Sequence, residues 1–406
     1  MNYTSFVNRH VVYLEYQLFP KEKFMVTTAI ICEFNPFHNG HKYLMDTARR
    51  VTQADFVIAI MSGNFVQRGE PAIIDKWART KACLKAGADL VVELPCFASF
   101  APANLYAYYG VRTAHDLGIV DYLAFGSETG RTAEDLQNLA DKLDGRDDIF
   151  TTNLKENLDT GKSYASCVAS ALGFTPGAND ILGIEYIRAL RKLDSSIIPF
   201  SIERISGEKI SSAADIRSAI KENKDISNFL PKEICHIPAE EIRKGRGPVF
   251  IENFEQAIMM SLRSKTHEEI AMLPYVSEGL EYAIYKNACS STSLDSFLQA
   301  VTCARYTKSR IRRICLASML GIKRDDLQHT PGYIKVLGLR KSAGKLLNIL
   351  QENSKVPIGT STAKMAEYDK HLTNISRRIT DVYTLGYPNP SCRIGDLELT
   401  HSAVFE

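Results

Sequence analysis

Apolar and polar positions change their spacing along the chain, and the first half alternates between two patterns. Short runs rich in β-branched residues predict buried strands, whereas apolar residues three and four positions apart predict amphipathic helices. The strands are expected at 26–32, 56–61, 90–94, 122–125 and 197–202, and the helices at 42–51, 76–86, 104–117 and 133–143. This order predicts right-handed βαβ units and an α/β fold with a Rossmann-like, doubly wound parallel sheet. Ligands of such sheets bind beyond the carboxyl ends of the strands, where the strand order reverses.

From about residue 231 the strand pattern fades and helical spacing dominates. Helices are expected at 254–262, 268–272, 278–288, 294–303 and 309–320. We therefore expect a second, all-helical domain, joined through 231–248, a stretch rich in proline, glycine and charge. Residues 1–24 lack the features of a secretory signal, and Met25 stands just before the first strand. The predicted organisation is an N-terminal extension over 1–24, an α/β domain over 25–230 and a helical domain over 231–406.

The composition is that of an ordinary globular protein. Hydrophobic residues make up 45% and charged residues 24% of the 406 positions. The nine cysteines stand singly, without a C-x-x-C pair or a Cys/His ligand spacing, so neither a disulfide framework nor a zinc site is indicated. The longest apolar runs fall far below the roughly 18 residues that cross a bilayer. The expected location is the reducing cytoplasm, with no membrane contact.

The first strand ends in a turn that carries two histidines. Proline at Asn35-Pro36 denies the sheet a hydrogen-bond donor, and His38-Asn39-Gly40-His41 follows, directly before helical spacing begins. Free N–H groups and the helix dipole at such a turn favour an anion, and Gly40 lets the backbone approach a phosphate. Two imidazoles there can donate hydrogen bonds to an α-phosphate as negative charge builds up on it. The alternative is a loop with two chance histidines.

A second phosphate-loop candidate fails on its spacing. Gly161-Lys162-Ser163 matches the end of a P-loop, but Glu156 occupies the position of the required earlier glycine. We therefore predict no P-loop.

One segment of the second half is strongly basic. Between Val301 and Lys345 there are 11 Lys or Arg residues and only two acidic ones, although the whole chain carries a net charge of +2. Tyr306 and Tyr333 lie within this segment, and positive charge with interleaved aromatic residues suits RNA. The predicted RNA-binding residues are Arg305, Tyr306, Lys308, Arg310, Arg312 and Arg313. A solvated basic helix is the alternative for 310–313.

The histidine motif resembles that of the HxGH nucleotidyltransferase superfamily, kin to the class I aminoacyl-tRNA synthetases. The longer string Glu33-Phe34-Asn35-Pro36-Phe37-His38-Asn39-Gly40-His41 is similar to one family, the bacterial tRNA(Met) cytidine acetate ligases. Further similar segments are 61–72, 76–81 and 125–128. The resemblance implies that ATP activates acetate as acetyl-adenylate. The acetyl group is then passed to the exocyclic amine of the wobble cytidine of elongator methionine tRNA, forming N(4)-acetylcytidine.

The resemblance also implies site residues. His38, His41 and Arg217 are the catalytic candidates, because Ile210-Ser211-Ser212-Ala213-Ala214-Asp215-Ile216-Arg217 resembles the second phosphate motif of the superfamily. Ala213 replaces the usual threonine of that motif. The implied ATP ligands are Ile31, Cys32, Glu33, Phe34, Asn35, Pro36, Phe37, His38, Asn39, Gly40, His41, Lys42, Tyr43, Leu44, Gly126, Asn179 and Arg204.

Each of these assignments has a simpler alternative. Asn179 is also well placed as the N-cap of a helix, Arg204 as a solvated arginine, and 210–217 as an ordinary capped helix start. Mg²⁺ is expected to accompany the triphosphate, but no dedicated carboxylate cage for it is evident. The roles of Glu70, Glu93 and Asp121 stay open between lining the cleft and holding the sheet edges.

Three other functions compete with acetate ligation. A small-molecule adenylyltransferase would share the histidine turn but give no reason for a basic helical domain. A non-catalytic RNA-binding protein on a nucleotide-binding fold would not need both histidines. A synthetase would need a lysine-rich signature loop that is missing here.

Overall fold

The computed structural model describes residues 25–146, 177–204, 212–277 and 279–406. The predicted extension over 1–24, the rejected P-loop at Gly161-Lys162-Ser163 and the start of the second phosphate motif, Ile210-Ser211, lie outside the described residues.

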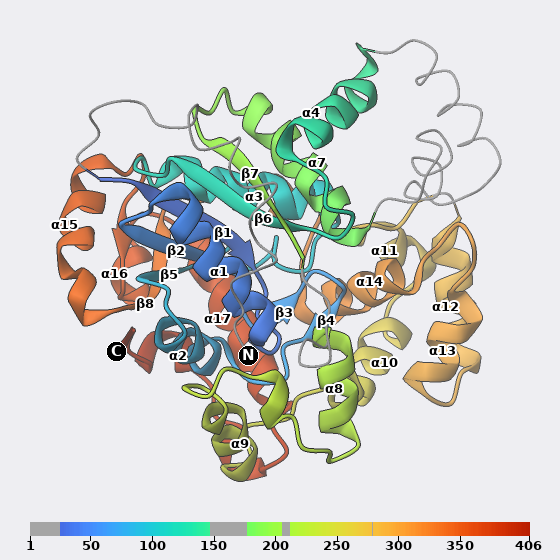
Figure 1. Cartoon of the computed structure of the whole chain (residues 1–406). Helices are drawn as coiled ribbons and strands as arrows, with labels where there is room; N and C mark the ends of the chain where they lie inside the picture. The colour runs from blue at the N-terminus through green and yellow to red at the C-terminus, as the bar shows by residue number, and fades with distance from the viewer. Residues whose placement is uncertain (1–24, 147–176, 205–211, 278) are drawn as a thin grey trace.

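A central sheet organises the fold (Figure 1). Its strands follow the order β10-β8-β5-β2-β1-β6-β7, with β9 paired to β8. Their bounds are β1 Thr27–Cys32, β2 Phe56–Met61, β5 Leu90–Glu93, β6 Tyr122–Ser127, β7 Ile198–Glu203, β8 Ile334–Leu339, β9 Ile358–Gly359 and β10 Val404–Phe405. The pairs from β5 through β7 are all parallel, and the order reverses between β1 and β6. The predicted α/β class with a doubly wound, mainly parallel sheet is confirmed.

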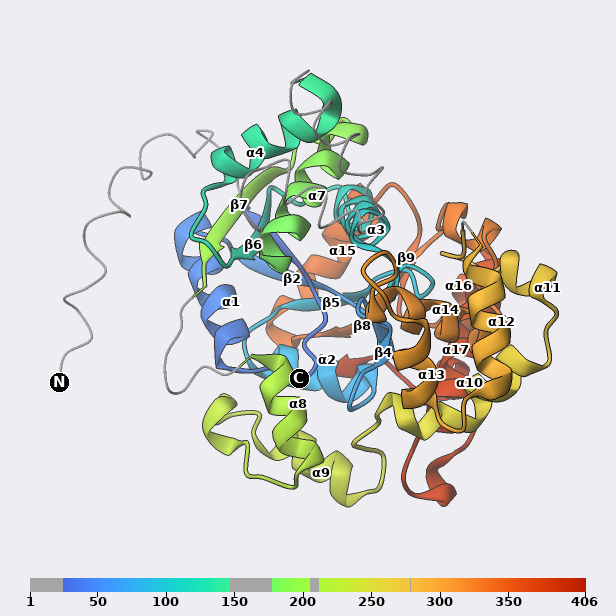
Figure 2. The same cartoon turned by 90° about the vertical axis from the view of Figure 1, so that its right-hand side faces the viewer.

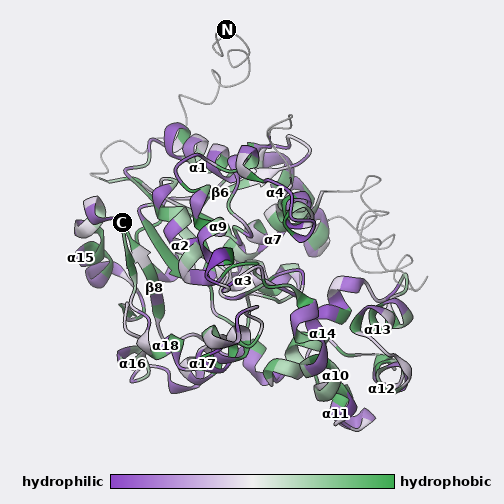
Figure 3. Cartoon of the chain, turned by 90° about the horizontal axis from the view of Figure 1, so that it is seen from below, coloured by the Kyte–Doolittle hydropathy of each residue, from purple (hydrophilic) through white to green (hydrophobic). Residues whose placement is uncertain are grey.

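Helices cover both faces of the sheet because successive strand residues point to opposite sides. On β1, Ile30 and Cys32 join one buried cluster, which includes residues of α1 (Asn39–Thr52) and α2 (Lys76–Lys85). Ala29 and Ile31 join the other cluster, with α3 (Ala103–Asp116) and α7 (Ala178–Lys192). Figure 3 shows the strands mostly in hydrophobic colours and hydrophilic residues on the outer helix faces.

The other helices continue these layers. They are α4 (Ala133–Asp141), α8 (Ala213–Lys221), α9 (His236–Arg243), α10 (Glu255–Arg263), α11 (His267–Ala271), α12 (Leu280–Ser290), α13 (Leu294–Val301), α14 (Lys308–Leu320), α15 (Gly344–Asn353), α16 (Thr362–Met365), α17 (Lys370–Thr384) and α18 (Leu397–Thr400). Helices α10 to α14 gather on one side of the sheet (Figures 1 and 2). Strands β3 (Phe65–Val66) and β4 (Glu70–Pro71) form a hairpin. The ring of Phe65 contacts those of Phe254 and Tyr383, so the first half of the chain and the region over 231–406 share one core. Within the described ranges, no helix combines the length and apolar content needed to cross a bilayer.

In one respect the structure differs from the expectation, because the region over 231–406 is not all-helical. Strand β8 is fully buried and pairs antiparallel with β5, so it extends the sheet of the first half. A buried partner covers the backbone groups that β5 would otherwise expose as an edge strand. The sheet therefore crosses the predicted domain boundary.

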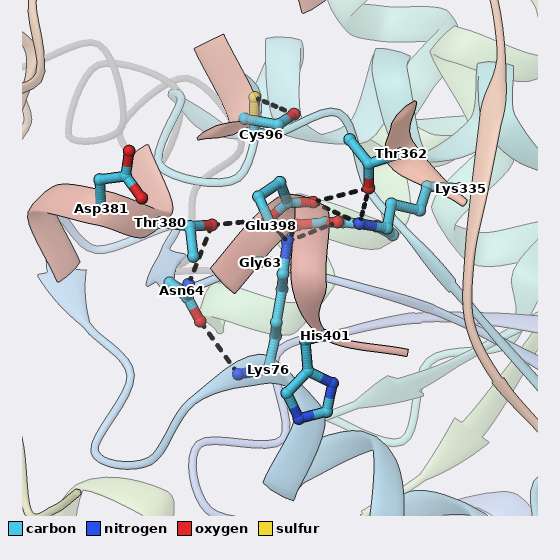
Figure 4. Close-up of polar contacts among 12 residues, drawn as sticks. Gly63, Asn64, Lys76, Cys96, Lys335, Thr362, Thr380, Asp381, Glu398 and His401 are labelled. Carbon is cyan, nitrogen blue, oxygen red and sulfur yellow. Dashed lines mark hydrogen bonds and ion pairs between the residues drawn. The ribbon is translucent and has the colours of Figure 1, made fainter. Parts of the chain in front are cut away.

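A buried group of charges ties the end of this region to the sheet. Lys76 Nζ lies 2.7 Å from Glu93 Oε1 and 2.6 Å from Glu398 Oε2, and Glu398 Oε1 pairs with Lys335. These four side chains, here called the charge tetrad, are at most 7% exposed. Figure 4 shows Glu398 with Lys335, Thr362 and Thr380 around it. Burial alone would raise the pKa of Glu398, but the two lysines lower it to about 2.

Candidate active site

A cleft opens where the sheet order reverses, at the carboxyl ends of β1 and β6. Its volume is about 1040 Å³. The lining comes from the end of β1, the first turn of α1, the loop after β6, and the starts of α7, α8 and α14. The cleft therefore brings together the histidine turn, the second phosphate motif and the basic helix, as expected for a ligand site of a doubly wound sheet.

His38 and His41 lie at the start of α1 and cap it. His38 Nδ1 accepts a hydrogen bond from the Gly40 N–H at 3.0 Å, and His41 Nδ1 accepts one from the His38 N–H at 3.3 Å. Because Nδ1 is the acceptor in both rings, a neutral imidazole here carries its proton on Nε2. Each ring thus keeps one N–H donor available, and both side chains line the cleft.

The surroundings hold both rings in the neutral form. Burial lowers the pKa of His38 to about 4, and the positive charges of Arg204 and Arg217 act in the same direction. Burial lowers the pKa of His41 well below its ordinary value, with smaller contributions from His38 and Arg204. At neutral pH the pair can therefore donate two hydrogen bonds without carrying charge.

The backbone amides of this turn serve the helix itself. The Gly40 N–H is bound to the His38 ring, and the N–H groups of His41 and Lys42 donate to the His38 carbonyl at 2.9 and 3.1 Å. The expectation that these amides are free for a phosphate is therefore wrong for the three residues. The ring Nε2 donors and the nearby arginines are the groups at this turn that can still bind an anion.

Arg204, Asn179 and Glu128 form a small network on the other side of the cleft. Glu128 Oε1 accepts from Arg204 Nη1 at 3.0 Å and from Asn179 Nδ2 at 2.9 Å. The alternative role of Asn179 as an N-cap is wrong, because Gly177 is the N-cap of α7 and Asn179 is the second residue of the helix. Gly126 leaves room for the arginine, since a Cβ there would lie 3.1 Å from Arg204 Cγ.

Arg217 reaches from α8 to the histidine turn. Its Nη1 donates to the Asn35 carbonyl at 2.9 Å, and its Nη2 lies 3.5 Å from Glu70 Oε2. Ser212 caps the helix through a reciprocal pair of hydrogen bonds with Asp215. The motif thus combines a capped helix start with an arginine, Arg217, that lines the cleft.

Gln67 joins two further polar groups of the cleft, Glu33 and Arg313. The Gln67 N–H donates to Glu33 Oε1 at 2.9 Å, and the Gln67 carbonyl accepts from Arg313 Nε at 2.9 Å. Burial raises the pKa of Glu33, although the Gln67 N–H and Arg217 partly oppose this. Among the described residues, Glu33 is the cleft carboxylate without an ion pair, since Glu128 pairs with Arg204 and Glu185 with Arg188.

Comparison with known proteins identifies the family. A model described as HIGH Nucleotidyl Transferase matches residues 25–396. The tRNA(Met) cytidine acetate ligase of Acetivibrio thermocellus is 37% identical, over 94% of this chain and 100% of its own length. The chain belongs to the tRNA(Met) cytidine acetate ligase family. The resemblance seen in the histidine motif is thereby confirmed.

Two further relatives agree with this assignment. The tRNA(Met) cytidine acetate ligase of Caldanaerobacter subterraneus subsp. tengcongensis is 37% identical, over 90% of this chain and 96% of its own. The crystal structure of Thermotoga maritima TmcAL bound with alpha-thio ATP superimposes with a TM-score of 0.88 at 33% identity, covering 94% of this chain and 99% of that one.

Only some of the ATP ligands that were predicted for this cytidine acetate ligase family member line the cleft. The lining includes Ile31, Cys32, Glu33, Phe34, His38, His41, Leu44, Gly126, Asn179, Arg204 and the catalytic candidate Arg217. The other predicted ligands lie outside the lining: Asn35, Pro36, Phe37, Asn39, Gly40, Lys42 and Tyr43. Asn35 Oδ1 accepts from the Ile73 N–H at 2.9 Å, and Lys42 pairs with Asp46 at 2.6 Å. ATP contact by each of these residues stays a prediction.

The predicted RNA-binding residues differ in their surroundings. Arg305, Arg310 and Arg313 line the cleft, and Arg305 and Lys308 are exposed. The ring of Tyr306 lies 5.1 Å from the Arg310 guanidinium, whereas Arg312 pairs with Glu70. Elsewhere in the basic segment, Lys335 belongs to the buried tetrad and Arg324 donates to main-chain carbonyls. RNA contact by the six residues stays a prediction.

The structure also places the carboxylates whose roles the sequence left open. Asp121 Oδ2 accepts from the Thr27 N–H at 2.9 Å and so holds β1 beside β6, while Glu93 belongs to the charge tetrad. Glu70 binds Arg217 and Arg312. The turn Gly126-Ser127-Glu128 was expected at this site and contributes Glu128 to the cleft, whereas Tyr275 was missed because nothing local in the sequence singles it out.

Proposed function

We propose that this protein uses ATP to activate acetate as acetyl-adenylate and then acetylates the wobble cytidine of elongator tRNA(Met). The observation that carries the proposal is the pair of neutral imidazoles in a cleft that cationic side chains of α14 also line. The names of the family members and the ATP analogue in the Thermotoga maritima structure support it. A small-molecule adenylyltransferase would leave the cationic wall of the cleft unexplained.

In the first step, an acetate oxygen attacks the α-phosphorus of ATP, the bond to the bridging oxygen breaks and pyrophosphate leaves. The Nε2–H donors of His38 and His41 stabilise the negative charge that builds up on the α-phosphate oxygens. Arg204 and Arg217 would bind the remaining phosphates, because guanidinium stays charged and can bind two oxygens at once. Arg204 would exchange Glu128 for phosphate when ATP binds.

In the second step, the cytidine N4 attacks the acetyl carbon, the bond from that carbon to the AMP oxygen breaks, and AMP leaves. The amine loses one proton, and a positioned carboxylate can accept it. Glu33 fits this role because it lines the cleft, lacks an ion pair among the described residues and has a raised pKa. A higher pKa makes its carboxylate a better base.

Mg²⁺ would accompany the triphosphate in this proposal, bound mainly by phosphate oxygens. Within the described ranges, no three His, Cys, Asp or Glu side chains come together as metal ligands, and the carboxylates of the cleft do not form such a set. We therefore derive no step through a metal bound by this chain.

The tRNA would lie against the helical part. We propose that residues 25–230 hold ATP while 231–406 hold the tRNA, through Arg305 and Arg310, which line the cleft, and the exposed Lys308. The eight cysteines that the structure describes are unpaired, which suits a reaction in the reducing cytoplasm.

The test is mass spectrometry of tRNA nucleosides after incubation with ATP and isotope-labelled acetate. The expected product is labelled N(4)-acetylcytidine at the wobble position of elongator tRNA(Met), formed only when ATP is present. If pyrophosphate is released and no nucleoside carries the label, the proposed acceptor is wrong.

A further inference from the structure

Arg313 is a buried cation that pairs with no acidic side chain among the described residues. Its side chain lines the cleft and is 9% exposed, and its Nε donates to the Gln67 carbonyl at 2.9 Å. Among the described residues, its two terminal NH₂ groups have no hydrogen-bond partner and no carboxylate lies within ion-pair distance. An unpaired buried charge is costly, so such a group favours an anion in the cleft. Burial lowers the pKa of Arg313 to about 10, which leaves it charged at neutral pH.

A second polar group without a partner stands beside it. The Tyr275 hydroxyl is buried and has no hydrogen-bond partner in the described part of the chain, and the tyrosine lines the same cleft. The Tyr275 carbonyl accepts from Arg310 Nε at 2.9 Å, so the residue is fixed against α14. An unsatisfied buried hydroxyl costs free energy that a ligand can recover.

We propose that Arg313 and Tyr275 bind the carboxylate of acetate. The inference rests on the proposed function and names its acyl-substrate subsite. A guanidinium can donate two parallel hydrogen bonds to a carboxylate, and a phenol hydroxyl can donate a third. Buried aromatic rings of Phe34 and Tyr106 line the cleft and can pack against the methyl group.

A carboxylate suits this site better than a phosphate of RNA. Arg313 is nearly buried, whereas Arg305 and Lys308 are exposed and accessible to a polymer backbone. Gln67 joins Arg313 to Glu33, so an acetyl group at this site would lie close to the carboxylate proposed to take the cytidine proton. In this proposal Arg313 binds acetate, whereas tRNA contact by Arg313 stays a prediction.

The test compares Arg313→Gln and Tyr275→Phe with Lys323→Gln, a control that removes one exposed charge of the same basic segment. Acetyl transfer to tRNA is measured against acetate concentration, and the Kd values for a nonhydrolysable ATP analogue and for tRNA are measured alongside. Arg313→Gln should raise the KM for acetate about tenfold or more, and Tyr275→Phe by roughly fivefold, with both Kd values unchanged. Lys323→Gln should leave the KM for acetate and the Kd for the ATP analogue unchanged.

Tyr275→Phe separates binding from structure. The variant removes a hydroxyl that has no partner in the described part of the chain, so the thermal midpoint should stay constant or rise while the KM for acetate increases. It also tests the proposal if Arg313→Gln fails to fold. An unchanged KM for acetate in Tyr275→Phe, or a loss in Arg313→Gln confined to tRNA or ATP binding, would overturn the assignment.

Direct binding separates this subsite from the proposed reaction. Line broadening of ¹³C-acetate by the wild-type protein should be saturable and should be lost in Arg313→Gln. If the wild type acetylates no tRNA but binds acetate through Arg313, the proposed function fails and the subsite stands. If the wild type acetylates tRNA and Arg313→Gln retains both the broadening and the KM, the subsite fails and the function stands.

Discussion

The imidazole rings of His38 and His41 stack on each other, with centroids 3.6 Å apart and planes 27° from parallel. Each ring accepts a backbone hydrogen bond at Nδ1, so each presents an Nε2 donor that costs little reorganisation during the reaction. Replacement of His41 by alanine should therefore lower acetate-dependent ATP–pyrophosphate exchange by about 10²–10³. His267→Ala, which removes a histidine on α11 outside the cleft, is the control. Full exchange activity in His41→Ala would contradict the assignment.

The same two residues make stability depend on pH. An unfolded chain protonates its histidines near pH 6.5, whereas His38 in the folded protein has a pKa of about 4 and that of His41 is also lowered. The unfolded chain thus binds more protons between these values, so the free energy of unfolding should fall as the pH drops through this window. Above it, both histidines are neutral in both states. Urea titrations should show a shallower decline for His41→Ala than for the wild type, and equal slopes would disprove the coupling.

A substitution at Glu33 should affect the second of the two chemical steps and spare the first. Glu33→Gln keeps an oxygen that can accept the Gln67 N–H but removes the proton acceptor. Adenylate formation should therefore persist while acetyl transfer to tRNA slows by roughly 10²-fold. In the wild type, single-turnover transfer should rise with pH through the raised pKa of Glu33 and then level off. Rapid-quench measurements follow both steps, and equal losses in the two steps would rule out the proposed role.

Glu128 pairs with two of the residues that are predicted to bind ATP. Its carboxylate binds Arg204 and Asn179 on the exposed side of the cleft. Glu128→Gln removes a negative charge close to the phosphates and should tighten binding of an ATP analogue by roughly twofold to fivefold at low salt, since exposed ion pairs are weak. Calorimetry at two salt concentrations measures this change. Weaker binding would instead identify Glu128 as a ligand of the nucleotide.

The charge tetrad should contribute strongly to stability. Glu398→Gln leaves Lys76 and Lys335 buried with one carboxylate instead of two, and loss of a partner in a buried ion pair costs about 3–5 kcal/mol. The comparison is Glu352→Gln on the exposed side of α15, which should change the free energy of unfolding by less than about 0.5 kcal/mol. Denaturant titrations measure both, and equal stabilities of the two variants would contradict the structural role.

The parts of the fold that follow local rules were predictable. The strands 26–32 and 56–61 and the helix after His41 have clear periodicity, and the structure places them within a few residues of the expected bounds. Strand β8 was missed because a short buried run within a basic segment carries no signal for its partner β5, more than 200 positions away. Likewise, the Tyr275–Arg313 site depends on a loop and a helix that meet only in the folded protein.

The charge tetrad can form only late in synthesis, because Glu398 follows Lys76 by 322 positions. At roughly 5–20 residues per second, a ribosome needs about 16 s or more to add the second carboxylate after the first lysine. Until Ile334–Leu339 has been synthesised, β5 lacks its neighbour β8 and presents an open edge. An open edge can pair with other chains, so the nascent chain is prone to aggregation until the distal segment emerges.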